Sequence, residues 1–166
     1  MIRPLYLDAS ALVKLVADDV DELPGREAVR AYYWPHAANV YSTSYSITEA
    51  LSAFKGKYVR GGIARDVYKH YIGEFLKLTI GSNLRIDEVQ ILSPSVRDDF
   101  ARLIDTYDDI DFLDCFQLAT IKHGRYSVLV GGSKPLLITA DKKLAEAARK
   151  ENLEAWYCVD EPAPPT

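Results

Sequence analysis

The stretch RPLYLDASALVKLVAD, residues 3–18, decides the expected fold. Its first part, residues 3–8, is a short apolar run that ends in Asp8, and apolar residues then recur at helical spacing from Leu12 to Val16. We therefore predict a strand, a sharp turn at Asp8 and a helix. A buried strand that leads directly into a helix is the repeating unit of α/β folds.

The same alternation continues to the end of the chain. Further strands are expected over residues 39–44, 84–92, 135–140 and 154–159, and helices over 22–35, 46 to the Gly61-Gly62 break, 63–79, 93–107, 111–123 and 142–150. Pro24 lies near the start of the second helix, and Pro35 is expected to end it. This order predicts a three-layer α/β/α fold with a central, mostly parallel sheet. The segment 125–134 has no clear assignment.

Length and composition predict one domain over residues 1–160 and a loose, Pro-rich tail over 161–166. No apolar run approaches the roughly 18–20 residues that span a bilayer, and the N-terminus does not resemble a secretory signal. We expect a cytoplasmic protein without a membrane partner. Cys115 and Cys158 lie in apolar stretches and are expected to be buried free thiols.

The formal net charge of −4 is an objection to a nucleic-acid partner, because phosphate contacts usually come from a basic surface. The objection weakens if four of the acids form a metal site. Without those four charges the rest of the chain is neutral, and bound cations would reverse the sign of the site. Net charge therefore does not exclude nucleic acid.

Four acids lie at the joints between predicted elements. Asp8 and Asp141 directly follow strands, Glu49 falls in the first turn of the helix after the second strand, and Asp114 lies on the helix 111–123. In open parallel sheets, ligands bind beyond the carboxyl ends of the strands, so the fold would bring these acids to one edge. Carboxylate oxygens are the ligands that Mg²⁺ and Mn²⁺ prefer. The pattern predicts a site for one or two such ions.

Each acid also has a structural alternative. Ser46 and Glu49 form the S-x-x-E pattern of a capping box. Asp141 suits the N-cap of the following helix, and Asp8 suits a loop after the sheet. Asp114 suits a solvated helix face, although its neighbours are apolar.

Three further residues are expected to support the site. Ser10 and Thr139 can hydrogen-bond the acids and hold them in place, while Ser10 also suits an N-cap. Asp111 is expected to cap its helix and lies one turn from Asp114.

A basic stretch follows Glu49 and includes Lys55, Lys57 and Arg60. Such a run is often a solvated face, but it can also guide an RNA backbone towards the acids. Nearby tyrosines could stack on bases, namely Tyr58, Tyr68 and Tyr71.

Four segments carry a family resemblance, and they occur in the family's order: YLDASALVKL at 6–15, SITEAL at 46–51, DCFQLATIKHG at 114–124 and ITADKKLAEAA at 138–148. Together they resemble the PIN-domain ribonucleases, especially the VapC-like toxins of toxin–antitoxin pairs. The matching positions are an Asp before a small residue and Ser, a Glu on the next helix, an Asp-x-x-x-x-Ala-Thr helix and a Thr-x-Asp motif.

The resemblance implies that Asp8, Glu49, Asp114 and Asp141 are both catalytic and metal-binding. It also implies a doubly wound sheet, Mg²⁺ or Mn²⁺, cleavage of single-stranded or structured RNA, a homodimer and an inhibitory antitoxin. The segment 125–134 departs from the family pattern because it is longer than a minimal connection. Three other functions stay open: a DNA nuclease, a phosphatase or phospho-acceptor domain, and a non-catalytic module that binds RNA or protein.

Overall fold

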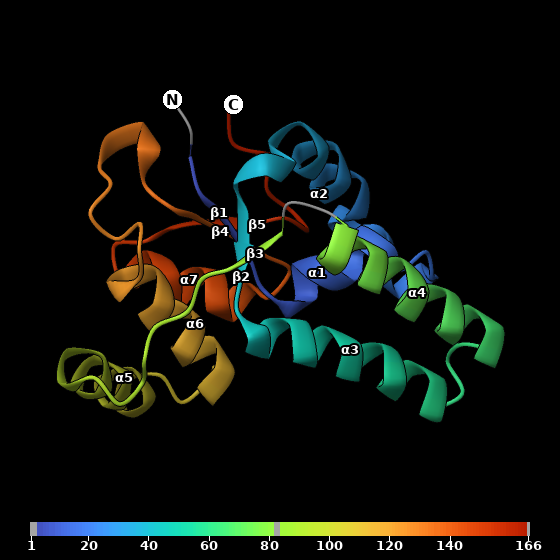
Figure 1. Cartoon of the computed structure of the whole chain (residues 1–166), viewed down its shortest axis with the longest axis horizontal. Helices are drawn as coiled ribbons and strands as arrows, with labels where there is room; N and C mark the ends of the chain where they lie inside the picture. Colours follow the sequence, from blue (N-terminus) through green and yellow to red (C-terminus); the bar gives the residue numbers. More distant parts are fainter. Residues whose placement is uncertain (1–2, 82–83, 166) are drawn as a thin grey trace.

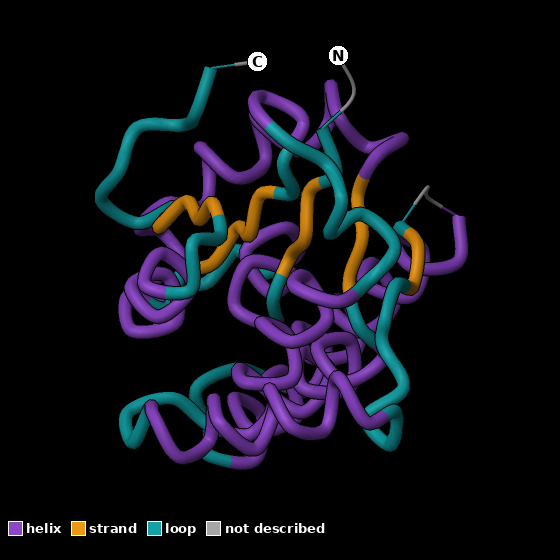
Figure 2. The backbone as a smooth tube through the Cα atoms, turned by 90° about the vertical axis from the view of Figure 1, so that its left-hand side faces the viewer, coloured by secondary structure: helices purple, strands orange, loops and turns teal. Residues whose placement is uncertain are grey.

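The structure, a computed structural model, describes residues 3–81 and 84–165. Within these residues the centre is a five-stranded sheet in the order β3-β2-β1-β4-β5, and all four pairings are parallel. The strands are β1 (Leu5–Leu7), β2 (Val40–Ser42), β3 (Arg85–Ile86), β4 (Leu136–Thr139) and β5 (Glu154–Tyr157). Figure 2 shows the strands side by side in orange. The chain leaves β1 towards β2 on one side and later returns to β4 on the other, so the strand order reverses between β1 and β4.

Helices cover both faces of this sheet. The described residues form α1 (Ala9–Val16), α2 (Leu23–His36), α3 (Ser44–Val59), α4 (Arg65–Gly81), α5 (Pro94–Thr106), α6 (Phe112–His123) and α7 (Lys142–Lys150). Leu5 and Leu7 of β1 face a core built with α1 to α4, whereas Tyr6 faces a second core built with α5 to α7. Figure 1 shows the two groups of helices separated by the sheet. The predicted three-layer α/β/α fold is confirmed.

The predicted strand over 84–92 is wrong in length, because only Arg85–Ile86 pairs with β2. This strand is exposed and lies at the edge of the sheet, so burial does not hold the chain extended. The two acids that follow are used in long-range hydrogen bonds instead. Asp87 accepts one from the Tyr6 hydroxyl, and Glu88 accepts one from the Ser44 backbone N–H at 2.9 Å.

Helix boundaries differ from the prediction in two places. The regular part of α2 starts only after Pro24 and Gly25, since Gly25 has a φ of +75° and a Cβ there would lie 2.3 Å from the Cys158 carbonyl oxygen. The same helix continues one residue past Pro35, because a proline in the last turn interrupts little of the hydrogen bonding. The unassigned segment 125–134 consists of turns and a short 3₁₀ helix, Gly131–Ser133.

Cys115 and Cys158 are both buried and free, as predicted. Of the predicted tail, Glu161 is tied down, because its Oε2 accepts a hydrogen bond from the Tyr157 N–H at 3.0 Å. Residues 162–165 have no regular structure, and Thr166 lies outside the described residues. None of the helices in the described part of the chain has both the length and the hydropathy needed to span a membrane.

Candidate active site

Asp8 and Asp141 follow the two strands between which the strand order reverses. β1 and β4 pair along their length, with Leu7 opposite Ile138, and the Asp8 N–H donates to the Ile138 carbonyl at 3.3 Å. In parallel α/β sheets this reversal point leaves a crevice at the carboxyl edge, where ligands bind. The fold therefore places both acids where a ligand site is expected.

Asp8 is buried, with 6% of its surface exposed, and it is the N-cap of α1. One oxygen accepts from the Ala11 N–H at 2.8 Å, the Ser10 hydroxyl lies 2.9 Å from both oxygens, and the Thr139 hydroxyl donates at 2.6 Å. Burial raises the pKa of Asp8 to about 6, although these hydrogen bonds oppose the shift. A carboxylate held this firmly in a buried place is restricted to one orientation.

Ser10 and Thr139 form the support around Asp8. Besides donating to Asp8, the Ser10 hydroxyl accepts from the Ala140 N–H at 2.7 Å, and the Thr139 hydroxyl accepts from the Asp141 N–H at 2.9 Å. The hydrogen-bonding alternative for Ser10 is thus the observed one, since Asp8 takes the N-cap position. These bonds join the loops that follow β1 and β4.

Asp111 caps α6, as predicted, and accepts from the N–H groups of Leu113 and Asp114 at 2.8 and 2.9 Å. Asp114 in turn lies within 3.4 Å of the Asp111 N–H. The pKa of Asp114 rises to about 7, mainly through burial and then through the charges of Asp111, Asp8 and Asp141. The solvated-face alternative does not describe this half-buried residue.

Glu49 lies in the second turn of α3 and not in the first, because α3 begins at Ser44. Its N-cap is Thr43, whose side chain accepts from the Ser46 N–H at 3.0 Å. The predicted capping box between Ser46 and Glu49 is therefore wrong. Burial raises the pKa of Glu49, and the charges of Asp111, Asp8 and Asp141 raise it further. The charges of these acids therefore act on Glu49.

Asp141 is the N-cap of α7 and accepts from the N–H groups of Lys143 and Leu144 at 2.7 and 3.1 Å. The N-cap role that the sequence analysis gave as the structural alternative for Asp141 is therefore observed. It does not remove Asp141 from the site, because its charge also raises the pKa of the other three acids. We call Asp8, Glu49, Asp114 and Asp141 the acidic site.

The charges of the acidic site are not balanced by side chains of the described residues. Within residues 3–81 and 84–165, none of its four carboxylates forms an ion pair with Lys, Arg or His. In the same residues, no three metal-binding side chains converge closely enough to enclose an ion. The donor set is nonetheless one of hard oxygens that repel one another, and this chemistry fits a divalent cation such as Mg²⁺ or Mn²⁺.

Below the acids, α3 and α6 are joined by polar residues that the sequence analysis missed. The buried Gln117 side chain accepts from the Ser46 hydroxyl at 2.9 Å and from the Thr43 hydroxyl at 3.4 Å. A signal was available, because Ser46 and Gln117 each lie three residues from a site acid on the same helix. Residues at this spacing share a helix face.

The basic stretch lies towards the end of α3 that points away from the sheet (Figure 1). Lys57 is mostly buried and pairs with Asp19 at 2.7 Å and Glu22 at 3.0 Å, so its charge is balanced within the protein. Lys55 lies over the rings of Tyr58 and Tyr68, whose centroids are 5.1 Å apart.

Two other members of this predicted RNA-binding region differ in exposure. Arg60 is exposed, whereas Tyr71 is buried and its hydroxyl accepts from the Asp18 N–H. Tyr71 is therefore not accessible for base stacking.

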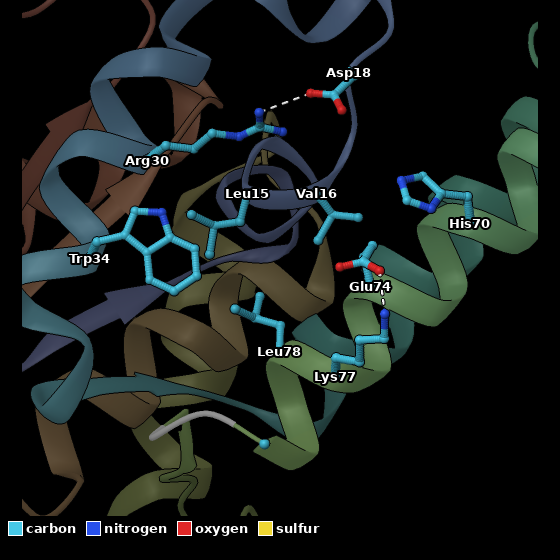
Figure 3. Close-up of a pocket in the computed structure, with 10 residues that line it drawn as sticks. Leu15, Val16, Asp18, Arg30, Trp34, His70, Glu74, Lys77 and Leu78 are labelled. Carbon is cyan, nitrogen blue, oxygen red and sulfur yellow. Dashed lines mark hydrogen bonds and ion pairs between the residues drawn. The ribbon is translucent and has the colours of Figure 1, made fainter.

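A large cavity, of about 510 Å³, lies elsewhere, between α1, α2 and α4. Figure 3 shows its apolar floor, with Leu15, Val16 and Leu78, and the exposed Trp34 at one side. None of the four carboxylates of the acidic site lines it. It is a separate feature of the surface.

No curated protein matches the sequence. The crystal structure of PAE2754 from Pyrobaculum aerophilum is similar to this chain, with a TM-score of 0.56, 16% identity and coverage of 89% of this chain and 86% of that one. At this identity the likeness shows the fold alone. The model of the PIN domain matches residues 5–150, and PIN domains are typically nucleases that use divalent metals. Because the match extends over most of the sequence, this chain belongs to the PIN domain family.

Proposed function

We propose that this protein is a metal-dependent endoribonuclease that cleaves single-stranded RNA at the acidic site. The observation that carries the proposal is the group of four carboxylates at the reversal point of the sheet, one buried and three partly buried, with which no described Lys, Arg or His forms an ion pair. Repulsion within such a group costs free energy, which a bound Mg²⁺ or Mn²⁺ would recover. Asp8, Glu49, Asp114 and Asp141 would hold the metal.

The residues of this chain prepare the site in two ways. Ser10 and Thr139 keep the Asp8 carboxylate in one orientation. The N-termini of α1, α6 and α7, capped by Asp8, Asp111 and Asp141, all begin at this edge. Because the N-terminal end of a helix is electropositive, these three ends favour the negative charge of the carboxylates that cap them. A divalent ion, when bound, supplies an activated water and stabilises charge on the leaving oxygen.

The finer part of the proposal is a toxin of the VapC-like kind, paired with an inhibitory antitoxin. It is supported by the order of the four motif segments along the sequence. On this proposal the protein is a homodimer that acts in the cytoplasm, where it would meet cellular RNA. Lys55 and Arg60 remain accessible to contact the RNA backbone, whereas Lys57 would act through its ion pairs within the fold.

The test is cleavage of an end-labelled single-stranded RNA with Mg²⁺, Mn²⁺ or EDTA, beside a DNA of the same sequence and a small phosphoester. Wild-type protein should cut RNA only with metal. Asp8→Asn should lose at least about 100-fold in rate, more than the loss typical of groups that only support a ligand. Asp105→Asn, an exposed acid on α5, should cut as wild type does.

Each contrary result names another function. Cleavage that survives EDTA or Asp8→Asn would remove the metal mechanism. Cleavage of DNA in preference to RNA would identify a DNA nuclease, and turnover of the phosphoester alone would identify a phosphatase. RNA binding without turnover under any metal would favour a non-catalytic module.

A further inference from the structure

A buried hydrogen-bonded contact joins the two helices that carry Glu49 and Asp114. Gln117 of α6 is only 1% exposed, and its Oε1 accepts from the Ser46 hydroxyl of α3 at 2.9 Å. The Thr43 hydroxyl, which caps α3, lies 2.9 Å from the Ser46 hydroxyl and 3.4 Å from the same Gln117 oxygen. The amide is therefore fixed to the first turn of α3.

The position of this contact relates it to the acidic site. Ser46 lies three residues before Glu49 on α3, and Gln117 lies three residues after Asp114 on α6. Since residues at this spacing share one face of a helix, the contact lies one turn from both carboxylates on the facing sides of α3 and α6. Any change in the approach of the two helices at Ser46 and Gln117 also changes the separation of Glu49 and Asp114.

Two buried polar groups next to this contact have no hydrogen-bond partner among the described residues. Among the described residues, neither the buried Gln117 Nε2 nor the buried Thr120 hydroxyl one turn further has a hydrogen-bond partner. An unpaired buried amide is unfavourable, whereas an apolar side chain of similar size would fill the same space without that penalty. Helix packing alone therefore does not account for a glutamine here.

We propose that Gln117 is a positioning residue for the Glu49–Asp114 pair: through Ser46 it sets the distance at which α3 and α6 hold the two carboxylates. The proposal rests on the proposed function, because it gives Gln117 a role in the same metal site. Gln117 acts through Ser46 and does not itself bind the metal. Thr43 and Ser46 extend the same contact to the start of α3.

The experiment measures Mn²⁺ binding by calorimetry, well below the melting temperature, and kcat and KM for the RNA in parallel. Gln117→Met keeps the volume and removes the amide, and Ser46→Ala removes the donor while leaving Gln117 in place. Each should weaken Mn²⁺ binding by about 10–100-fold, the range for groups that orient metal ligands. The double variant should be no weaker than either single one, because both remove the same contact. Ser46→Thr, which retains a hydroxyl, should restore binding to within about twofold of wild type.

The matched control is Ile121→Val, a buried change on the same helix that lowers stability without touching the contact. It should leave Mn²⁺ affinity unchanged and should not lower kcat. The proposal is overturned if Gln117→Met and Ser46→Ala bind Mn²⁺ within twofold of wild type, or if Ile121→Val weakens binding as much as they do.

Failure of the proposed function gives a different result. If the wild-type protein binds no Mn²⁺, the nuclease proposal fails, and metal-free melting temperatures at pH 8 then decide the role of Gln117. Glu49→Gln relieves repulsion in the acidic site and should raise the melting temperature. If Gln117 sets the spacing, this rise should differ between proteins with Gln and with Met at position 117. Equal rises in both backgrounds would overturn the proposal.

Discussion

Two groups of carboxylates in this molecule lie in opposite electrostatic surroundings. In the acidic site, acids face acids, and burial raises the pKa of Asp8 to about 6 and of Asp114 to about 7. In a second group, acids of α5 and of the turn after α7 face cations of α5 and α6. We call this second group the ion network, and its members are Asp99, Arg102, Lys122, His123 and Glu151.

The ion network lowers the pKa values of its two acids. Hydrogen bonds from Arg102 and Lys122 lower the pKa of Glu151 to about 2, with a further contribution from the Tyr107 hydroxyl. Burial acts to raise the pKa of Asp99, but hydrogen bonds from Lys122, His123 and Arg102 outweigh it and hold that pKa well below its usual range. The difference teaches that a buried acid with cation partners stabilises the fold, whereas a buried acid without them leaves a charge for a ligand to balance.

The largest expected effect is the loss of stability caused by Glu151→Gln in the ion network. Glu151 accepts two hydrogen bonds from Arg102, at 2.6 and 3.0 Å, one from Lys122 at 2.7 Å and one from Tyr107 at 2.9 Å. Removing its charge weakens these four bonds, which join α5, its C-cap residue and α6 to the end of α7. We expect a loss of about 2 kcal/mol in the free energy of unfolding, in the range for hydrogen bonds to charged groups. Urea denaturation at pH 7 measures it.

Glu146→Gln is the control for this prediction, because Glu146 is an exposed acid on α7. It should change stability by less than about 0.5 kcal/mol. Equal effects of Glu151→Gln and Glu146→Gln would mean that the ion network contributes little to the free energy of unfolding. The proposed difference between the ion network and the acidic site would then be wrong.

The second prediction is a stability maximum in the metal-free protein at about pH 4–5, between the two titration ranges. The lowered pKa of Glu151 contributes stability that is present above the unfolded-state value of about 4.5 and is lost as the pH falls towards 2. The raised pKa values of Asp8 and Asp114 act in the opposite sense. Their contribution is full below the unfolded-state value of about 3.8 and is lost as the pH rises through 6 and 7.

We expect the free energy of unfolding in EDTA to fall by about 1–2 kcal/mol between pH 5 and pH 8. Thermal unfolding across this range measures the fall. Asp8→Asn combined with Asp114→Asn should flatten it, and saturating Mn²⁺ at pH 8 should reverse it in wild type. A wild-type curve that rises steadily from pH 4 to pH 8 in EDTA would contradict the assignment of the acidic site as an unbalanced group.

The sequence alone predicted the fold and part of the acidic site. The fold followed from local patterns, because buried strands such as PLLITA and amphipathic helices leave a periodic signal in a few residues. The positions of Asp8 and Asp141 followed from the rule that ligands bind beyond the strand ends.

What the sequence did not show depends on contacts between distant residues. Only two residues of 84–92 pair as a strand, because this edge of the sheet is exposed, and the carboxylates of the two acids that follow accept hydrogen bonds from Tyr6 and Ser44. The N-cap of α3 is Thr43 and not Ser46, so Glu49 has no place in a capping box, since α3 starts two residues earlier than its apolar periodicity indicates. Lys57 belongs to an ion-paired cluster and not to an open basic face, because Asp19 and Glu22 are brought against it by the turn after α1.

The smallest expected effect is also the most direct comparison, because one substitution is made in both groups. Asp114→Asn removes a charge that has no cation partner among the described residues and that burial and three other acids disfavour. Asp99→Asn removes a charge that accepts hydrogen bonds from the cations Arg102 and Lys122 and that lies beside the His123 ring. In EDTA at pH 7.5, Asp114→Asn should raise the free energy of unfolding by about 1 kcal/mol, whereas Asp99→Asn should lower it.

Adding metal should reverse the order of stability between wild type and variant for Asp114→Asn but not for Asp99→Asn. With saturating Mn²⁺, wild type should melt higher than Asp114→Asn, because the carboxylate lost from the acidic site is one that would hold the ion. The Asp99→Asn protein should gain as much from Mn²⁺ as wild type does, since the ion network already contains its own cations. If both variants were destabilised in EDTA, Asp114 would be an ordinary structural acid, and the difference between the two groups would not be one of stability against ligand binding.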